Sequence, residues 1–222
     1  KKDSEKTKMS GYQLYYFPIR GRAEMARWAF AVAKIDFEDV RLSGEEWAKE
    51  KASGRAPFGQ MPFLVTPEGK VLAQSGAIMK YICKKGGVSP SDSFDEALAD
   101  MIHDGVYDLR NDLSKGHHEK DEAKKIELMT KFFLTTLPER LGKFEAILKS
   151  RDEGKGFFFG DKLTYADISF VEFANGLKVS IDNQKAKGNP MPDIGEIIGK
   201  CPLLVAYIDR VLAVPEIKTW VE

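Results

Sequence analysis

The residues Tyr-Gln-Leu-Tyr-Tyr-Phe-Pro-Ile-Arg-Gly-Arg-Ala-Glu, at positions 12–24, decide how the first part of this chain folds. The first five predict a strand whose alternation puts Tyr12, Leu14 and Tyr16 on one face. Residues 23–34 are alanine-rich with apolar residues at helical spacing, so the proline and glycine between these segments mark a turn. Tyr16 therefore ends a strand just before a helix. A core aromatic is its ordinary explanation, and a ligand contact is the functional one.

The elements that follow this stretch predict a small open α/β sheet. They are an extended segment at 37–42, a short helix at 45–52, strands at 63–66 and 71–73 around a turn at 67–69, and a helix at 76–84. A polar connector rich in glycine, proline and serine comes next, as is typical between domains. We expect an N-terminal arm over 1–10, a first domain over 11–85, a linker over 86–93 and a second domain over 94–222.

The second half of the chain carries apolar residues at helical spacing and no convincing strand pattern. The predicted helices span residues 96–113, 122–150, 165–179 and 202–212. Thr164 and Asp167 have the spacing of a capping box at the start of the third of these helices. The sequence therefore predicts an all-helical second domain.

Charge and cysteine content exclude several classes of function. The 222 residues carry 34 basic and 34 acidic side chains, so no net field favours nucleic acid or an anionic membrane. No apolar run approaches the roughly 20 residues of a membrane span. Cys83 and Cys201 are far apart and lack C-x-x-C spacing, which argues against a disulfide scaffold, a thiol redox motif or a cysteine zinc site.

Two segments of the first domain are candidates for ligand contacts through the backbone. Met61-Pro62 begins a strand, so its peptide bond is a candidate for the cis form, with an ordinary trans proline as the alternative. Gln74-Ser75 joins a strand to a helix, with Ser75 as the expected N-cap. The free N–H groups of that helix end suit a carboxylate or phosphate, although most serine caps bind nothing.

Three further groups of side chains allow a functional or a purely structural interpretation. Ser43 and Glu46 form a capping box on a short helix whose Trp47 and Lys51 either cover the core or meet a ligand carboxylate. Aspartates at 100, 104 and 108 share one helix stripe, which is either a solvated face or a site for an ammonium group or a metal. The His-His-Glu sequence at 117–119 lacks metal-ligand spacing and is interpreted as a surface loop.

In combination, these motifs resemble those of the glutathione S-transferase family, and within it the sigma class that includes glutathione-dependent prostaglandin D synthases. The resemblance runs from Tyr12 to Trp220. It is carried by Tyr-Phe-Pro-x-x-Gly-Arg-Ala-Glu from Tyr16, Phe-Gly-Gln-Met-Pro from Phe58, Gln74-Ser75 and the capping box at 164–167. It implies the glutathione transferase fold, with an α/β thioredoxin-like N-terminal domain that binds glutathione and an all-α C-terminal domain that holds the second substrate.

The resemblance also implies roles for individual residues. Tyr16 matches the tyrosine that donates to the glutathione sulfur, and Arg22 matches an arginine that adds positive charge beside it. The remaining glutathione-binding positions are Phe17, Trp47, Lys51, Gln60, Met61, Pro62, Gln74, Ser75 and Asp108. Gln60 stands where many relatives have lysine, so we expect a neutral hydrogen bond in place of one charge contact there.

The resemblance further implies a homodimer, in which Asp108 reaches the glutathione of the neighbouring subunit. Some prostaglandin synthases of this class hold a metal between subunits through three aspartates. Here Asp104 and Asp108 remain with Tyr107 between them, so we expect no metal and glutathione as the co-substrate. The expected electrophile pocket consists of Phe17, Arg22, Tyr107, Arg110, Ser169 and Phe173.

Three interpretations follow from the sequence. The first is an enzyme that attacks hydrophobic electrophiles or lipids with the glutathione thiol, with conversion of prostaglandin H to prostaglandin D as a further activity. The second is a catalytically weak structural protein, as in lens crystallins of this lineage, and the third is a binding module, as in translation factors with this fold. The intact Tyr16, Arg22, Gln74 and Ser75 favour the enzyme. The family is mostly cytoplasmic, and the charged arm without an initiator methionine leaves secretion as the alternative.

Overall fold

The computed structural model describes residues 11–222, except for the side chain of Asp152. The chain forms two compact units, of which the first ends at Gly87 and the second runs from Val88 to Glu222. Within residues 11–222, every helix is too short or too polar to span a bilayer.

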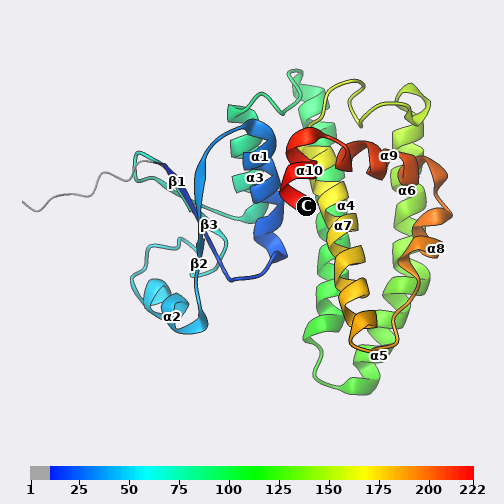
Figure 1. Cartoon of the computed structure of the whole chain (residues 1–222), viewed down its shortest axis with the longest axis horizontal. Coiled ribbons are helices and arrows are strands. Elements are labelled where there is room, and N and C mark those ends of the chain that lie inside the picture. Colours follow the sequence, from blue (N-terminus) through cyan, green and yellow to red (C-terminus); the bar gives the residue numbers. More distant parts are fainter. Residues whose placement is uncertain (1–10) are drawn as a thin grey trace, which may run out of the picture. The chain divides into compact units, whose positions relative to one another are not determined.

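The first unit is built on a four-stranded sheet (Figure 1). Its strands are β1 (Tyr12–Tyr16), β2 (Phe37–Arg41), β3 (Phe63–Val65) and β4 (Val71–Ala73), in the order β2-β1-β3-β4. β1 pairs with β2 in parallel and with β3 in antiparallel fashion, and β3 and β4 form an antiparallel pair. Helices α1 (Glu24–Ala33) and α3 (Ser75–Lys85) pack against each other, and α2 (Gly44–Ala52) follows β2. The predicted α/β thioredoxin-like architecture is therefore confirmed.

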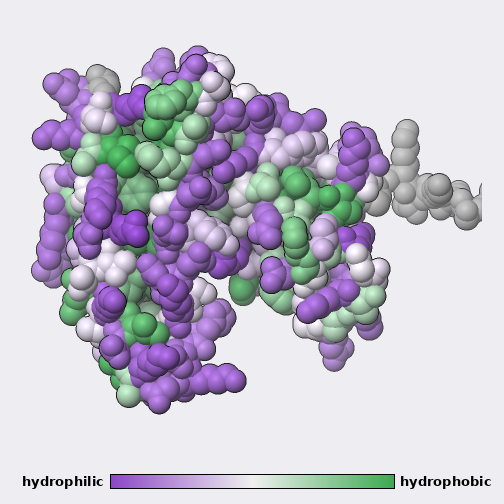
Figure 2. All heavy atoms as spheres, turned by 180° about the vertical axis from the view of Figure 1, so that it is seen from behind, coloured by the Kyte–Doolittle hydropathy of each residue, from purple (hydrophilic) through white to green (hydrophobic). Residues whose placement is uncertain are grey.

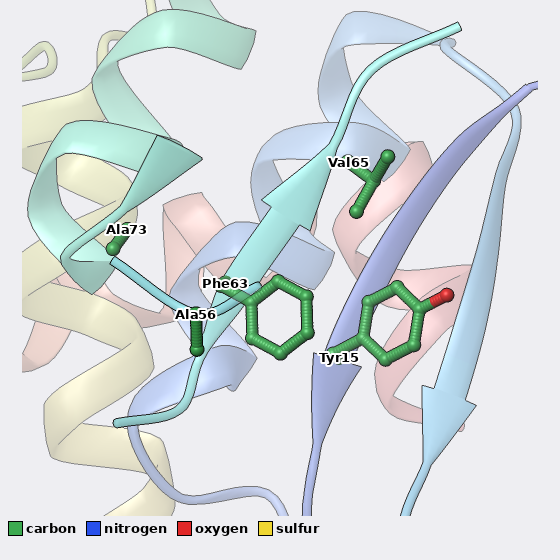
Figure 3. Packing of buried hydrophobic residues seen from close by; sticks show 5 residues of the cluster. All are labelled: Tyr15, Ala56, Phe63, Val65 and Ala73. Carbon is green, nitrogen blue, oxygen red and sulfur yellow. The ribbon is translucent and has the colours of Figure 1, made fainter. Parts of the chain in front are cut away.

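The alternation along β1 explains how both faces of the sheet are covered. Tyr12 and Leu14 are buried, and the Tyr12 ring lies 5.7 Å from that of Phe30 on α1. Tyr15 points to the opposite face, where its ring stacks on Phe63 at 4.5 Å. Figure 3 shows these two rings within the Tyr15 cluster, which consists of Tyr15, Ala56, Phe63, Val65 and Ala73. β1 is thus an inner strand with a packed core on each face of the sheet, and its last residue is Tyr16.

The second unit is helical, as predicted. Its helices are α4 (Ser93–His118), α5 (Glu122–Lys131), α6 (Leu137–Lys149), α7 (Tyr165–Ala186), α8 (Ile194–Gly199), α9 (Pro202–Leu212) and α10 (Pro215–Val221). The sequence pattern missed α8 and α10, which have six and seven residues and so offer little periodicity to detect. The expected surface loop at 117–119 is wrong in part, because His117 and His118 form the last turn of α4, although both are exposed.

The helix predicted over 122–150 contains a π-helical segment at Phe132–Thr136 between α5 and α6. Pro138 follows this segment in the first turn of α6. A proline inside a helix has no N–H to donate and its ring clashes with the carbonyl four residues earlier. The wider turn accommodates it, and the N–H of Leu137 donates to the carbonyl of Phe132, five residues back. The chain therefore continues as a helix past the proline.

The predicted capping box at the start of α7 is present and is part of a buried network. The Asp167 carboxylate is fully buried and accepts hydrogen bonds from the backbone N–H groups of Phe158 and Thr164, at 2.9 and 2.7 Å. It also accepts from the Thr164 hydroxyl at 2.9 Å and from the Tyr207 hydroxyl on α9 at 2.7 Å. One side chain thus joins the preceding loop, α7 and α9.

On the face shown in Figure 2 most residues are hydrophilic, and hydrophobic residues gather only in small groups. Large apolar side chains that are exposed among residues 11–222 are Ile19, Phe58, Phe94, Met101, Ile126, Leu134 and Val205. Single exposed apolar residues are ordinary on a soluble surface.

Candidate functional site

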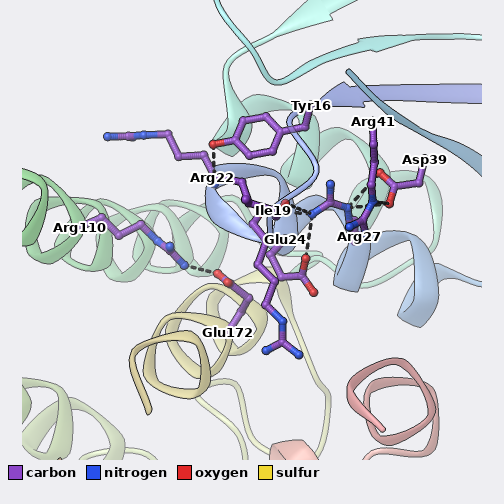
Figure 4. A network of polar contacts seen from close by, with 10 residues as sticks. Tyr16, Ile19, Arg22, Glu24, Arg27, Asp39, Arg41, Arg110 and Glu172 are labelled. Atoms are coloured by element: carbon purple, nitrogen blue, oxygen red, sulfur yellow. Dashed lines mark hydrogen bonds and ion pairs between the residues drawn. The ribbon is translucent and has the colours of Figure 1, made fainter. Parts of the chain in front are cut away.

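Tyr16 is held at the end of β1 with its hydroxyl turned toward the loop that follows. Its side chain is 7% exposed, and its hydroxyl oxygen accepts a hydrogen bond from the backbone N–H of Arg22 at 3.1 Å (Figure 4). Gly21 has a φ of +48°, and a Cβ there would lie 2.7 Å from the Tyr16 hydroxyl oxygen. Only glycine therefore fits between the turn and the tyrosine.

The residues beside Tyr16 belong to the same turn. Phe17 is half-buried, and its ring meets that of Tyr16 edge to face at 5.7 Å. Arg22 is also half-buried and lies in the short 3₁₀ helix η1 (Gly21–Ala23). The sequence-predicted pair of Tyr16 and Arg22 is thus brought together by a backbone contact.

The Met61–Pro62 peptide bond is cis, which confirms the candidate identified from the sequence. Pro62 is buried and leads directly into β3, while Met61 is half-buried and packs against the Tyr15 cluster. Gln60, immediately before them, is exposed. In the loop before β3, the Gln60 side chain is therefore exposed to solvent next to a backbone that is fixed by the packing of Met61 and Pro62.

The junction of β4 and α3 differs from the expectation in one respect. Ser75 is the first residue of the helix and is 6% exposed, so the prediction that it is the N-cap is wrong. Gln74 occupies the cap position, with φ 73° and ψ 115°, and makes no side-chain capping bond. A residue other than glycine rarely adopts such a positive φ, and local strain of this kind concentrates at functional sites. Gln74 is exposed, so this strained backbone lies at the surface.

Helix α2 is fixed by two polar contacts, one of which the sequence did not indicate. The predicted capping box is formed, with Glu46 N–H donating to the Ser43 hydroxyl and Ser43 N–H donating to Glu46. Arg55 forms a bidentate ion pair with Glu50, at 2.6 and 2.8 Å, and its guanidinium lies 4.5 Å from the centre of the Tyr15 ring. A lone arginine in a loop gives no pattern from which this contact follows.

Trp47 and Lys51 occupy different environments on α2. Trp47 is half-buried and packs against the Tyr15 cluster, which supports its interpretation as a residue that covers the core. Lys51 is exposed one turn later. The ammonium group is therefore accessible, while the indole is anchored beside it.

Arg27 on α1 is a residue that the sequence analysis missed. It is fully buried and contacts Glu24, Asp39 and the carbonyls of the Tyr16–Arg22 loop (Figure 4). A signal was present, because this arginine interrupts an otherwise apolar helix face. A charge at such a position is rarely buried without partners.

The three aspartates on one stripe of α4 lie in different environments. Asp100 accepts a hydrogen bond from the Tyr165 hydroxyl at 2.6 Å, so it joins α4 to α7. Asp104 and Asp108 are exposed, as expected for a solvated face. Tyr107 between them is half-buried, with its ring 6.4 Å from that of His103. Among the described residues, no group of three or more histidine, cysteine, aspartate or glutamate side chains is arranged to hold a metal.

The other second-unit residues expected near an electrophile lie on α4 and α7. Arg110 forms an ion pair with the buried Glu172, and its guanidinium lies 5.2 Å from the centre of the Phe173 ring. Ser169 is fully buried and shares a 2.8 Å hydrogen bond with Nδ1 of His103. Its hydroxyl thus joins the two helices, whereas part of Arg110 reaches the surface.

Comparison of this chain with known proteins identifies related domains and full-length relatives. Residues 12–84 match the glutathione S-transferase N-terminal domain, and residues 107–222 match the glutathione S-transferase C-terminal domain. S-crystallin SL11 of Nototodarus sloanii is 31% identical over 96% of this chain and 97% of its own. Hematopoietic prostaglandin D synthase of Gallus gallus is 32% identical over 96% of each chain.

A solved structure gives the same result. Monomeric Na-GST-3, a glutathione S-transferase of the hookworm Necator americanus, superimposes with a TM-score of 0.77 at 33% identity, over 95% of this chain and 96% of its own. Both the sequence matches and the fold extend over nearly the whole chain. The chain therefore belongs to the glutathione S-transferase family.

Proposed function

We propose that this glutathione S-transferase activates the thiol of glutathione through the hydroxyl of Tyr16. One observation carries the proposal. The Tyr16 oxygen accepts the Arg22 N–H, and no group among residues 11–222 accepts its proton. The O–H is therefore available to donate to a sulfur. A thiol with a pKa near 8.5 is mostly protonated at neutral pH, so a donor that favours the thiolate increases the amount of nucleophile.

We propose that the rest of glutathione binds to the first unit. The N–H groups of Ser75 and the next two residues begin α3 without partners inside the helix, and they suit the γ-glutamyl carboxylate next to Gln74. The Met61 backbone pairs with the cysteinyl part. The indole N–H of Trp47, the exposed ammonium of Lys51 and the Gln60 amide hold the glycyl end. The support is that these groups lie at the start of α3, in the loop before β3 and on α2.

The test of thiol activation compares two adjacent tyrosines with the same exposure. Tyr16→Phe removes the proposed donor to an anion, a bond worth roughly 1.5–3 kcal/mol, so kcat/KM with an aryl halide should fall about ten- to a hundredfold. Tyr15→Phe removes a hydroxyl that donates to Gln13, on the opposite face of the sheet, and should leave the rate unchanged. Equal rates and pH profiles for wild type and Tyr16→Phe would remove Tyr16 from the mechanism.

The same assay separates an enzyme from a crystallin-like protein. S-crystallin SL11, a relative over the full chain, makes a structural role the second candidate. An enzyme is retained on immobilised glutathione and conjugates the aryl halide. A structural protein does not conjugate the aryl halide, whether or not it is retained on immobilised glutathione.

We further propose a homodimer in which Asp108 completes the glutathione site of the other subunit. The exposure of Asp108 on α4 supports an intermolecular contact, although one relative of this fold is described as monomeric. Sedimentation should give about twice the chain mass. Asp108→Ala should raise KM for glutathione more than it lowers kcat, while Asp104→Ala, one turn away and equally exposed, is the control. A fully active monomer contradicts this arrangement.

The proposed second substrate is a hydrophobic electrophile or lipid, held by the second unit. The half-buried Tyr107 supplies apolar surface, the buried Phe173 ring lies against the Arg110 guanidinium, and the partly exposed Arg110 suits a carboxylate. Similarity to a prostaglandin D synthase favours prostaglandin H as one such substrate. In that reaction the thiolate attacks one endoperoxide oxygen, the O–O bond breaks, and the other oxygen takes up a proton to become a hydroxyl. A base then removes the proton from the ring carbon that bears the sulfur-bound oxygen, a C=O bond forms there, and the S–O bond breaks to release the glutathione thiolate. A yield of the D isomer no higher with glutathione than without it excludes this activity.

A further inference from the structure

The turn that carries the proposed catalytic groups has little packing of its own. Residues 18–21 are all exposed, including the apolar Ile19 at 57%. The carbonyl of Tyr16, before the turn, is fixed to β2 through the N–H of Leu42 at 2.8 Å. Inside the turn, the N–H of Ile19 donates to the carbonyl of Phe17 at 2.7 Å. Neither of these hydrogen bonds involves the carbonyls of Ile19 and Arg20, which are bound by a residue outside the turn.

Arg27 holds both of these carbonyls from beneath the turn. Its Nη1 donates to the carbonyl oxygens of Ile19 and Arg20, each at 3.1 Å. The same nitrogen donates to Glu24 at 2.9 Å, and Nε donates to both carboxylate oxygens of Asp39 at 3.0 and 3.1 Å. Figure 4 shows the guanidinium between the turn and Asp39 on β2. We name Glu24, Arg27 and Asp39 the turn clamp.

The composition of the turn clamp is unusual for a purely stabilising contact. The Arg27 side chain is fully buried, and its Nη2 has no hydrogen-bond partner among the described residues. Burial of ion pairs is costly, and apolar residues of similar volume often stabilise a fold as well or better. What an apolar side chain cannot do is donate to two successive carbonyls. The planar, multi-donor guanidinium is suited to that task.

The held carbonyls precede the groups that contact Tyr16. Gly21 and Arg22 follow Arg20 directly, and the Arg22 N–H bonds the Tyr16 hydroxyl at 3.1 Å. A displacement of the turn therefore changes the hydrogen bond that the Tyr16 hydroxyl accepts. We propose that Arg27 is a positioning residue for thiol activation, because the turn clamp fixes the position of the Arg22 N–H relative to the Tyr16 hydroxyl. This inference rests on the proposed role of Tyr16.

The experiment must separate positioning from stability. Arg27→Met removes the donors but leaves the buried Glu24 carboxylate and the half-buried Asp39 carboxylate without this partner, so it will also destabilise the fold. The triple variant Glu24→Gln, Arg27→Met, Asp39→Asn removes all three charges together and should recover much of that stability. Arg41→Met is the matched control, because Arg41 contacts the same Asp39 carboxylate at 2.8 Å from the exposed side and lies outside the turn clamp.

Four quantities are measured for each variant: the unfolding free energy, kcat, KM for glutathione, and the apparent pKa of the bound thiol from the pH profile of kcat/KM. Arg27→Met and the triple variant should both raise the apparent thiol pKa and lower kcat about tenfold, with KM changed less, because small misplacements of catalytic groups are costly. Arg41→Met should match wild type. A folded triple variant with the wild-type pH profile and kcat overturns the inference.

Tyr16→Phe in the same series keeps the two proposals distinguishable. If Tyr16→Phe shifts the thiol pKa and the Arg27 variants do not, only the turn clamp fails. If Tyr16→Phe leaves the profile unchanged, thiol activation by Tyr16 fails, and the positioning role fails with it.

Discussion

Adding a single methyl group at Gly21 should displace the hydroxyl of the proposed catalytic tyrosine. The Cβ of Gly21→Ala would lie 2.7 Å from the Tyr16 hydroxyl oxygen and 2.8 Å from Cε1 of the ring. Ordinary contacts between non-bonded heavy atoms begin near 3.5 Å, so the hydroxyl must retreat by roughly half an ångström or more. The ring is 7% exposed and packed on its neighbours, so this retreat moves the turn as well.

Gly69→Ala separates the backbone cost from the clash. Both glycines have positive φ, +48° and +77°, but a Cβ at Gly69 meets nothing within 4 Å. Each variant should therefore lose about 1–2 kcal/mol of unfolding free energy from the left-handed backbone. Only Gly21→Ala should also lose about tenfold or more in kcat, since a misplacement of 1 Å can cost about a hundredfold.

The assay combines denaturant unfolding with aryl-halide conjugation at saturating glutathione, where kcat reports the chemistry. If Gly21→Ala and Gly69→Ala have the same kcat relative to wild type, the position of the Tyr16 hydroxyl is not set by the turn. The reasoning that links the turn to the thiolate would then be refuted.

Three further predictions concern a buried hydrogen bond, a buried thiol and a half-buried ion pair. Tyr207→Phe removes one donor from the Asp167 carboxylate and should lower the unfolding free energy by roughly 1.5–3 kcal/mol in denaturant titrations, and an unchanged midpoint would contradict this. Burial raises the pKa of the Cys83 thiol, so an aromatic disulfide should label Cys83 only after unfolding, and rapid labelling of the native protein, read by mass spectrometry, would count against it. Arg55→Met breaks the ion pair with Glu50 that steadies α2, and should raise KM for glutathione severalfold with little change in kcat, whereas an unchanged KM would show that α2 does not need this contact.

Much of the fold can be predicted from local sequence patterns, because strand alternation and helix capping depend on residues that are close together in the sequence. Alternation along residues 12–16 determines the two faces of β1, and the capping boxes at Ser43 and Thr164 specify where α2 and α7 begin. The identity of the candidate site follows in the same way. Tyr16, Arg22 and Gln74 lie at junctions of strands and helices, where a sequence motif and a change of element coincide.

The sequence by itself did not determine which polar side chains the fold would bury. Arg27 and Arg55 acquire their roles only when β1, β2 and α2 bring carboxylates and aromatic rings to them. Asp100 belongs to a regular acidic stripe in the sequence, yet α7 brings the Tyr165 hydroxyl to it and so separates it from Asp104 and Asp108. Periodicity reports which face of an element is buried, whereas a hydrogen bond between distant residues depends on the orientation of two elements at once. Only the tertiary structure decides that orientation, and with it the geometry that holds the Tyr16 hydroxyl.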